Sequence, residues 1–327
     1  MPVCQKDKKI FYLDEKLCPY CGEKLIEPSL TDNFLKSFLE IDDKILKRFK
    51  DIRAKTIIEA KKLNQHPKFI KAIGITGSMR FINDKAKENS SSEFLVSKAL
   101  AELKTLGVKT ELLPLRKFNI QPCRACYSTT NTQCHFYCSC YPKGTKAGDD
   151  MSNILYDKVL GADIILFGTP VNNFKISTLM AAFIDRCISL DGSLAPADPK
   201  NPKNRELNIK HTKFVELMAE PKIPGSGYLK RFIGKAAGIF VTGHEEGASM
   251  LISQLFMTFN NYGMAFPSWS HMYAMSSVLL DTAEDKPIVT SPAYIEEAKQ
   301  IARNTLTLAK LLRKEKTTAW LYDNSAD

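Results

Sequence analysis

A unit of strand, loop and helix occurs three times in this chain, and this repetition limits the fold more than any other feature. Each unit begins with a short apolar run, at residues 69–76, 162–167 and 235–241. A loop rich in glycine or in hydroxyl side chains follows, and then a segment with apolar residues at helical spacing. Runs that are apolar throughout are typical of parallel strands buried on both faces. The pattern predicts an α/β fold with a doubly wound parallel sheet.

Two further strands, expected at residues 109–115 and 265–269, would complete a five-stranded sheet. Ser291 and Pro292 are typical of a helix start, which predicts a last helix up to Lys314.

Residues 30–65 carry an apolar stripe at spacings of three to five, which predicts one or two amphipathic helices. We therefore expect an N-terminal extension of residues 1–67, which bears cysteines and helices, and a sheet-containing domain of residues 68–327. Within that domain, the proline-rich stretch 192–213 is predicted to be an inserted loop.

The loop of the first unit has the composition of an anion site. It contains Gly77-Ser78-Met79-Arg80 and then Asn89-Ser90-Ser91-Ser92, directly before a predicted helix. Unpaired N–H groups and the positive end of the helix dipole attract anions, serine hydroxyls add donors, and arginine adds a charged hydrogen bond. Neither GxxxxGK[ST] nor GxGxxG is present, so the loop fits one phosphate monoester. The alternative is that the serines only cap the helix.

Five segments, in matching order and spacing, resemble the NAD(P)H-dependent FMN reductases of the flavodoxin-like superfamily, including their iron–sulfur flavoproteins. They lie within residues 69–275 and are GSMR…NSSS, Asp149–Met151, ADIILFGTPV, AFIDRC and GKAAGIFVTGHEEGA. The resemblance implies that three loops hold FMN. The residues that would hold its phosphate are Ser78, Arg80, Ser90, Ser91 and Ser92. Those along its ring system would be Pro170, Val171, Asn172 and Asn173, and those at its far edge Thr242, Gly243, His244 and Gly247. Relatives commonly carry an aromatic residue where this chain has Asn172-Asn173.

The resemblance also implies an activity. An oxidoreductase of this kind transfers a hydride from NAD(P)H to FMN and passes electrons to a flavin, quinone or similar small-molecule acceptor. The cofactor carries that chemistry, so no catalytic side chain is assigned. One alternative is an iron–sulfur flavoprotein that acts in electron transfer with a ferredoxin-type donor, and another is a sensor without enzymatic activity. Relatives assemble into dimers or tetramers, so a homodimer or homotetramer is expected.

The N-terminal cysteines suggest a metal site. Cys18-Pro19-Tyr20-Cys21-Gly22 has the sequence of a zinc-knuckle turn, in which two cysteines ligate one ion. Cys4 is the obvious third ligand. The fourth remains open between His66, a central cysteine and a partner chain, and the turn without metal is the alternative.

Five more cysteines crowd into one central segment: Cys123, Cys126, Cys134, Cys138 and Cys140. Iron–sulfur flavoproteins place their cluster ligands here with a CxxCxxC pattern and a later cysteine, but Thr129 stands at the third position. We take the first four cysteines as candidate ligands of an iron–sulfur cluster or zinc, with a metal-free loop as the alternative. Because the segment follows the second strand, its thiols are expected near the flavin loops.

The bulk composition excludes other classes. The net charge of +10 is spread along the chain, which suits small anions better than nucleic acid. No apolar run is long enough to cross a membrane, and the N-terminus lacks a signal-peptide core. We therefore expect a cytoplasmic protein without nucleic-acid or membrane partners. Nine cysteines without a secretion signal favour metal or redox use over disulfides.

Overall fold

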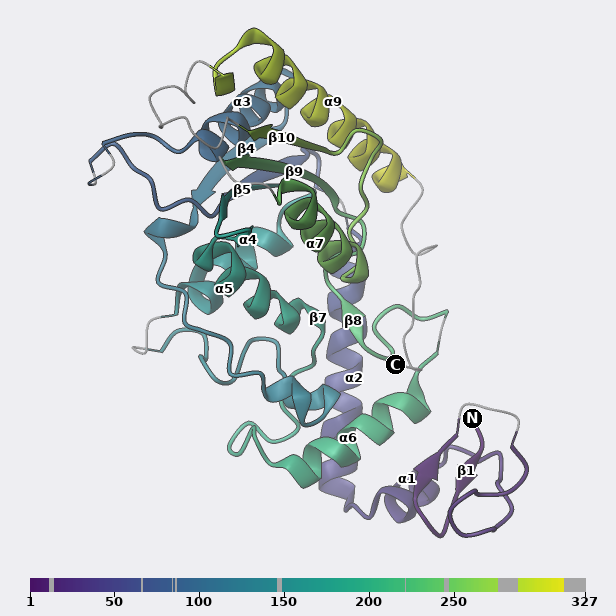
Figure 1. The fold of residues 1–327 in the computed structure, drawn as a ribbon. Coiled ribbons are helices and arrows are strands. Elements are labelled where there is room, and N and C mark those ends of the chain that lie inside the picture. Colours follow the sequence, from purple (N-terminus) through teal and green to yellow (C-terminus); the bar gives the residue numbers. More distant parts are fainter. Residues whose placement is uncertain are drawn as a thin grey trace.

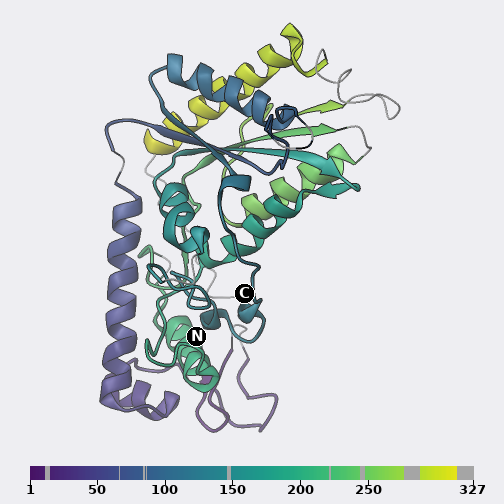
Figure 2. The same cartoon turned by 90° about the vertical axis from the view of Figure 1, so that its left-hand side faces the viewer.

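The computed structural model of the chain has a sheet flanked by helices at one end and a helical extension at the other (Figure 1). It describes residues 1–11, 15–65, 67–83, 85, 87–145, 149–220, 222–243, 247–275 and 288–314. Figure 2 shows helix α2 (Asp43–Leu63) of the extension as a rod that runs along one side of the molecule toward the sheet. In the part of the chain described, no helix is both long and apolar enough to cross a bilayer.

Five parallel strands form the central sheet in the order β10-β9-β5-β3-β4. Numbered along the chain, the spatial order is 2-1-3-4-5, which is the order of flavodoxin-like sheets. The predicted flavodoxin-like fold is therefore confirmed. A two-residue strand, β6 (Lys175–Ile176), turns back antiparallel on the end of β5. The parallel strands are β3 (Lys71–Thr76), β4 (Lys109–Pro114), β5 (Ile164–Asn172), β9 (Ala236–Gly243) and β10 (His271–Met275).

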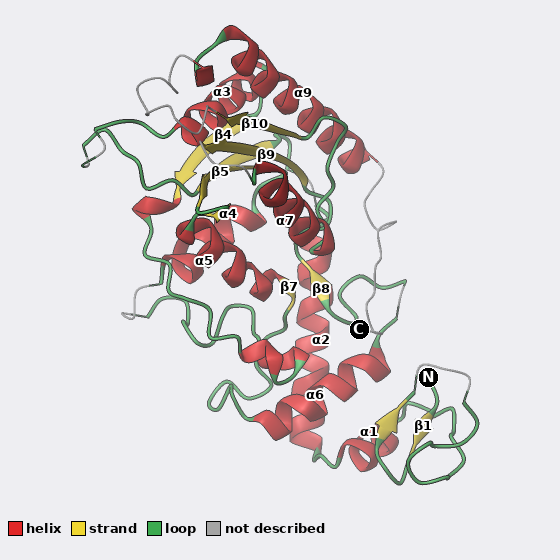
Figure 3. Cartoon of the chain, viewed as in Figure 1, coloured by secondary structure: helices red, strands yellow, loops and turns green. Residues whose placement is uncertain are grey.

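Helices cover both faces of the sheet (Figure 3). One face packs on α3 (Ser91–Thr105) and α9 (Pro292–Lys314), and the other on α4 (Tyr156–Leu160), α5 (Thr178–Cys187) and α7 (Ala248–Asn261). Alternate residues of a strand point to opposite faces of the sheet. Ala72 of β3 therefore packs in the core beneath α3 and α9, and Ile73 in the core beneath α4, α5 and α7. Gly74 permits the close approach of α3, because a Cβ there would lie 2.5 Å from Val96 Cγ1.

The fifth strand is the one strand predicted in the wrong place. It was expected at residues 265–269 but forms at His271–Met275. Ala265 makes only an isolated bridge to Ala236. Pro267 has no N–H to donate to a ladder, and the left-handed backbone of Trp269, with φ of 55°, interrupts the extended run.

The N-terminal extension contains the two predicted helices, α1 (Asp32–Leu39) and α2 (Asp43–Leu63). They follow a small head of residues 1–28, which holds the short strands β1 (Val3–Cys4) and β2 (Lys9–Ile10). The stretch 192–213 is not all loop, because Asn204 caps a 14-residue helix, α6 (Arg205–Met218). Two short strands join the ends of this insertion, β7 (Asp191–Gly192) and β8 (Leu229–Lys230).

The insertion packs on the extension. Phe38 and Phe49 of the extension share a core with Phe214 of α6. Just beyond β8, the buried Arg231 also bonds the extension, since it donates to both carboxylate oxygens of the partly exposed Glu59 on α2, at 2.6 and 2.9 Å. The insertion thus lies against the extension and contributes no residue to the cavity at the strand ends described next.

Candidate functional site

A cavity of about 320 Å³ opens at the carboxyl ends of the parallel strands, where doubly wound sheets bind their ligands. The loop after β3 and the carboxyl ends of β5 and β9 all reach it. Nine of the residues predicted to hold FMN line it: Ser78, Arg80, Ser90, Ser91, Pro170, Val171, Asn172, Thr242 and Gly243. Segments separated by up to 165 positions in sequence are therefore brought to one site.

The first loop and the start of α3 form a compact polar end of the cavity. Ser90 caps the helix, because its hydroxyl accepts the N–H of Glu93 at 3.2 Å. The N–H groups of Ser91 and Ser92 precede the first intrahelical hydrogen bond, so they face out of the helix start. Ser92 is buried beneath the surface, where its hydroxyl bonds that of Ser90 at 3.1 Å, and it does not line the cavity. The capping interpretation and the anion-site interpretation are thus compatible.

Arg80 lies at the rim of this polar end. Its backbone N–H donates to the Ser78 hydroxyl at 3.2 Å, which fixes the turn. Its guanidinium is 3.9 Å from Glu88, longer than a charged hydrogen bond, and the side chain is 40% exposed. The group can therefore reach a ligand at modest cost in lost interactions.

The negative charge nearest the helix start is neutralised from outside the cavity. Glu93, in the first turn of α3, forms a two-pronged ion pair with Arg116, one bond of which measures 3.0 Å. The Thr76 hydroxyl also lies 3.4 Å from this carboxylate. Because Glu93 is paired, it leaves the positive end of the helix dipole available to an anion.

The second loop ends in a tight hairpin between β5 and β6. Its two turn residues, Asn173 and Phe174, have φ of 49° and 60°, as a two-residue hairpin turn with right-handed twist requires. Asn172 lines the cavity, but Asn173 lies in the exposed turn and does not. The exposed Phe174 beside it does not line the cavity either.

The last two residues of β9, Thr242 and Gly243, line the cavity directly before the third loop. A Cβ on Gly243 would lie 3.0 Å from that of Val171, so the second and third loops are in contact. Gly247 starts α7 with φ of 112° and packs near Phe174, outside the cavity lining. His244 lies outside the described residues.

The sequence did not indicate four of the lining residues: Met79, Ala274, Ile288 and Val289. Met79 lies within the GSMR segment, so its position between Ser78 and Arg80 could have indicated that it lines the cavity. Ala274 was missed because β10 was expected six residues earlier in the chain. Ile288 and Val289 precede α9, and no local pattern marks them.

The central cysteines gather at the other end of α5. Cys126 Sγ lies 3.9 Å from Cys140 Sγ, and Cys134 Sγ lies 3.8 Å from the Ser189 hydroxyl just beyond α5. The cavity is at the start of α5, where Gly77 touches Ser177, and a ten-residue helix is about 15 Å long. The expectation that these thiols lie beside the flavin loops is therefore wrong, because the segment runs along α5 away from the strand ends.

A lysine from the insertion stabilises negative charge in this cysteine cluster. Lys203 Nζ lies 3.0 Å from Cys126 Sγ and 2.7 Å from the Gln133 carbonyl oxygen. Hydrogen bonds from the Cys134 and Cys140 thiols, together with Lys203, hold the pKa of Cys126 far below its usual range. A hydrogen bond from Cys140 likewise lowers the pKa of Cys138 to about 6. The thiols thus share protons and present anionic sulfur, the form that binds metal.

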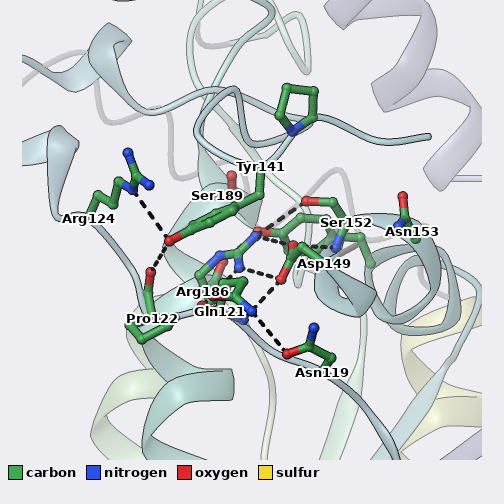
Figure 4. Close-up of polar contacts among 12 residues, drawn as sticks. Asn119, Gln121, Pro122, Arg124, Tyr141, Asp149, Ser152, Asn153, Arg186 and Ser189 are labelled. Atoms are coloured by element: carbon green, nitrogen blue, oxygen red, sulfur yellow. Dashed lines mark hydrogen bonds and ion pairs between the residues drawn. The ribbon is translucent and has the colours of Figure 1, made fainter. Parts of the chain in front are cut away.

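A buried ion pair holds both ends of the cysteine segment (Figure 4). Arg186 of α5 donates to the two carboxylate oxygens of Asp149 at 2.7 and 2.6 Å. The same guanidinium donates to the Gln121 carbonyl at 3.0 Å, so residues before and after the cysteines meet at one side chain. Burial alone would raise the pKa of Asp149, but the bonds from Arg186 outweigh it and leave that pKa below its usual value.

A second cysteine cluster lies in the head. The ligand atoms of Cys4, Asp7, Cys18 and Cys21 all lie within 4.8 Å of one another. The three predicted cysteines therefore meet, and Asp7 is the fourth side chain of this group. His66, one of the fourth ligands that the sequence suggested, lies outside the described residues. Among the residues described, this is the one group of three or more such side chains that is so compact.

Part of this chain resembles a known family. Residues 70–209 match the family model of NADPH-dependent FMN reductase. We call this segment the FMN reductase region. It contains the first two loops of the cavity and the cysteine segment, and it ends before the third loop. The family resemblance that the motifs indicated is confirmed.

A curated relative also matches part of this chain. An iron–sulfur flavoprotein of Archaeoglobus fulgidus is 30% identical over 119 residues, which are 36% of this chain and 51% of the relative. The chain thus spans about half the length of this curated relative.

Among solved structures, RosB with bound 8-demethyl-8-formylriboflavin-5'-phosphate has a TM-score of 0.51 and 17% identity, over 76% of this chain and 82% of that one. A flavone reductase has a TM-score of 0.44 and 19% identity, over 74% and 63%. At such identities the RosB match shows the fold.

Proposed function

We propose that the protein is an FMN-dependent oxidoreductase that oxidises NAD(P)H and reduces a flavin, a quinone or a similar small acceptor. The observation that carries this proposal is the cavity at the strand ends, which joins a polar helix start to two further loops. The match of residues 70–209 to the FMN reductase family supports it, since that match includes Ser78, Arg80 and Asn172. RosB, which shares the fold, binds a riboflavin 5'-phosphate derivative.

The residues of the cavity divide by chemistry in the way that FMN would require. Ser78, Ser90 and Arg80 offer hydroxyl and guanidinium donors, and the N–H groups of Ser91 and Ser92 lie beside them. Most of the remaining lining is apolar, and Asn172 and Thr242 add an amide and a hydroxyl. The apolar part comes from Met79, Pro170, Val171, Gly243, Ala274, Ile288 and Val289. An apolar surface with a few placed polar groups suits a flat ring system with polar edges.

When FMN is bound, its ring system supplies the hydride and electron transfer. The chain binds the phosphate and orients the ring against the second and third loops. The side chains of Pro170 and Val171 exclude water from the ring. No described side chain has to act as acid or base for this chemistry, so we assign no catalytic residue.

The direct test is the affinity for flavins of the purified, flavin-stripped protein. Titration should give tight binding of FMN, weaker binding of riboflavin, and no preference for FAD, because the site offers one phosphate pocket. Arg80→Ala should weaken FMN binding about 10- to 150-fold, which corresponds to about 1.5–3 kcal/mol for a hydrogen bond with a charged group. It should leave riboflavin binding unchanged.

Lys104→Ala is the matched control, since it removes one exposed lysine from the far end of α3. Its affinity for FMN should equal that of the parent protein. Equal loss of FMN and riboflavin affinity in Arg80→Ala would contradict the phosphate assignment. Steady-state oxidation of NADH and NADPH, with and without a quinone, then tests the enzymatic part of the proposal.

A second candidate function is electron transfer through an iron–sulfur cluster, with a ferredoxin-type donor. It is favoured by the gathering of Cys126, Cys134, Cys138 and Cys140 in one clamped segment, and by the iron–sulfur flavoprotein relative. Iron and acid-labile sulfide analysis of anaerobically purified protein decides between the two functions. A flavin spectrum without iron supports the reductase alone, and stoichiometric iron and sulfide support the second candidate.

A further inference from the structure

The head of residues 1–28 contains two turns of the same kind, one after the other. Cys4 and Asp7 bracket the first turn, between β1 and β2. Cys18 and Cys21 bracket the second, which an antiparallel bridge between Leu17 and Lys24 closes. Both turns place their two ligand residues three positions apart, so the first has the pattern CxxD and the second CxxC.

The two turns also have similar backbone conformations. The residue after the second ligand is left-handed in both turns, with φ of 53° at Lys8 and 73° at Gly22. A left-handed lysine is uncommon, so its presence indicates that the turn geometry is required there. In the first turn the Asp7 N–H also donates to Cys4 Sγ at 3.3 Å, the kind of bond that supports a thiolate ligand.

The side chains of the two turns converge on one point. Cys4 Sγ lies 3.5 Å from Cys21 Sγ, and Cys18 Sγ lies 3.1 Å from a carboxylate oxygen of Asp7. In a tetrahedral zinc site the metal–ligand lengths place two sulfur atoms roughly 3.8 Å apart, and a sulfur and an oxygen roughly 3.6 Å apart. A shift of a few tenths of an ångström would therefore admit the ion.

The head has almost no other core. Its buried cluster consists of Cys4, Cys18 and Leu25, with Phe11 and Cys21 at the margin. All nine cysteines of the chain are free thiols, so no disulfide holds the head together. Segments of this size ordinarily need a metal or disulfides to hold one conformation.

We propose that the head binds one Zn²⁺ in a closed tetrahedral site formed by Cys4, Asp7, Cys18 and Cys21. Asp7 takes the position of the fourth cysteine of a two-turn zinc site. Four protein ligands leave no open position for substrate, so the ion is structural. Lys6 and Lys9 lie close enough to act on the charge of Asp7 and reduce the excess negative charge of the site.

The metal would order the contact between the head and the rest of the extension. The carbonyl oxygen of Lys8, at the left-handed position, accepts a hydrogen bond from Lys213 of α6 at 2.6 Å. The Lys8 side chain donates to the Ser37 carbonyl on α1 at 3.4 Å, and Val3 belongs to the core shared by α1 and α6. The site thus fixes the surface by which the head docks.

The test uses the full-length protein, with zinc measured by mass spectrometry and the site probed by Co²⁺ substitution. We expect one zinc per chain, and cobalt bands typical of tetrahedral coordination with three thiolates. Asp7→Asn should weaken zinc affinity by more than about 100-fold, beyond the 10- to 100-fold effect of losing a group behind a ligand. Glu23→Gln is the matched control, because Glu23 is an exposed carboxylate in the same head.

Asp7→Cys tests whether Asp7 is itself a zinc ligand, because a cysteine can replace a ligand but not an aspartate that only supports the turn. It should restore zinc binding and increase the thiolate-to-cobalt charge-transfer absorption, because four thiolates replace three. Cys18→Ser should remove this zinc while leaving any iron held by the central cysteines unchanged, which separates the two clusters.

Three results would overturn the proposal. The first is that the head binds iron instead of zinc. The second is that thiol titration finds two fewer free thiols, because Cys4 and Cys21 form a disulfide. The third is that Asp7→Asn binds zinc with full affinity. Gel filtration and circular dichroism of each variant exclude general unfolding as the cause of metal loss.

Discussion

The buried pair of Arg186 and Asp149 makes the strongest prediction about stability (Figure 4). Both side chains are almost fully enclosed, with 1% and 2% exposed. Arg186→Met keeps most of the side-chain volume but removes four hydrogen bonds, two of them to the carboxylate. Asp149 would then remain buried with only backbone donors, from Gln121 at 3.2 Å and Ser152 at 3.0 Å.

An uncompensated buried charge costs about 3–5 kcal/mol when one partner of such a pair is removed. For a domain of this size we expect the midpoint of thermal unfolding to fall by about 6–20 °C. Circular dichroism during heating and during urea unfolding measures both quantities. Asp185→Asn is the control, because Asp185 is the exposed neighbour on the same helix and its loss should change stability by less than about 0.5 kcal/mol.

The double variant Arg186→Met with Asp149→Leu tests the cause. If the cost arises from the unpaired charge, replacing both partners should recover most of the lost stability. The cysteine segment should nevertheless become more accessible in the double variant, because Gln121 loses its bond to Arg186. A loss below about 1 kcal/mol in the single variant, or a double variant as unstable as the sum of both single changes, would refute the reasoning.

Two further predictions concern the head and helix α6. Removal of residues 1–28 should leave FMN affinity nearly unchanged, because none of the head residues that the structure describes lines the cavity. Complete loss of FMN in a titration would show that the head belongs to the site. Burial lowers the pKa of His211 to about 3, so below about pH 6.5 the unfolded chain takes up a proton that the folded protein does not. His211 should therefore lower the free energy of unfolding by about 2 kcal/mol at pH 5 relative to neutral pH. Urea unfolding at both pH values measures this difference, which should be smaller in His211→Phe. A substitution of the exposed His271 is the control and should leave the difference unchanged.

Local patterns in the sequence were sufficient for most of the fold. Four of five parallel strands were predicted, and three of them, β3, β5 and β9, are apolar runs that a glycine- or hydroxyl-rich loop follows. The Ser90 cap and the helix start at Pro292 were predicted because capping depends on neighbours within one turn. The order of the strands followed from the family resemblance and not from any pattern within a strand.

The failures share one physical cause, which is contact between distant segments. The strand β10 was misplaced because its apolar alternation is weak, and what defines it is pairing with β9. The helix α6 was missed because prolines dominate the stretch before it, while its stability comes from packing on α1 and α2. Asp7 carried a visible signal, since CxxD repeats the spacing of CxxC, but an aspartate is too common to stand out alone.

The cysteine segment was the hardest to predict, since several of the groups that hold it come from distant parts of the chain. Lys203 of the insertion bonds Cys126 and Gln133, and Asn208 bonds the Gln133 side chain at 2.7 Å. The segment also packs on Arg231, whose guanidinium lies 4.2 Å from the ring of Phe136 and is paired with Glu59 of α2.

Because α2 carries Glu59, the extension supports the cysteine segment through Arg231, and the insertion supports it through Lys203. A segment held from both sides in this way presents its thiols in a fixed arrangement, which a cluster requires and a free loop would not provide. The head lies at the far end of this scaffold, where its described residues contact α1 and α6. Loss of the head should therefore leave the central thiols in place, whereas loss of α2 should release Arg231 and loosen them.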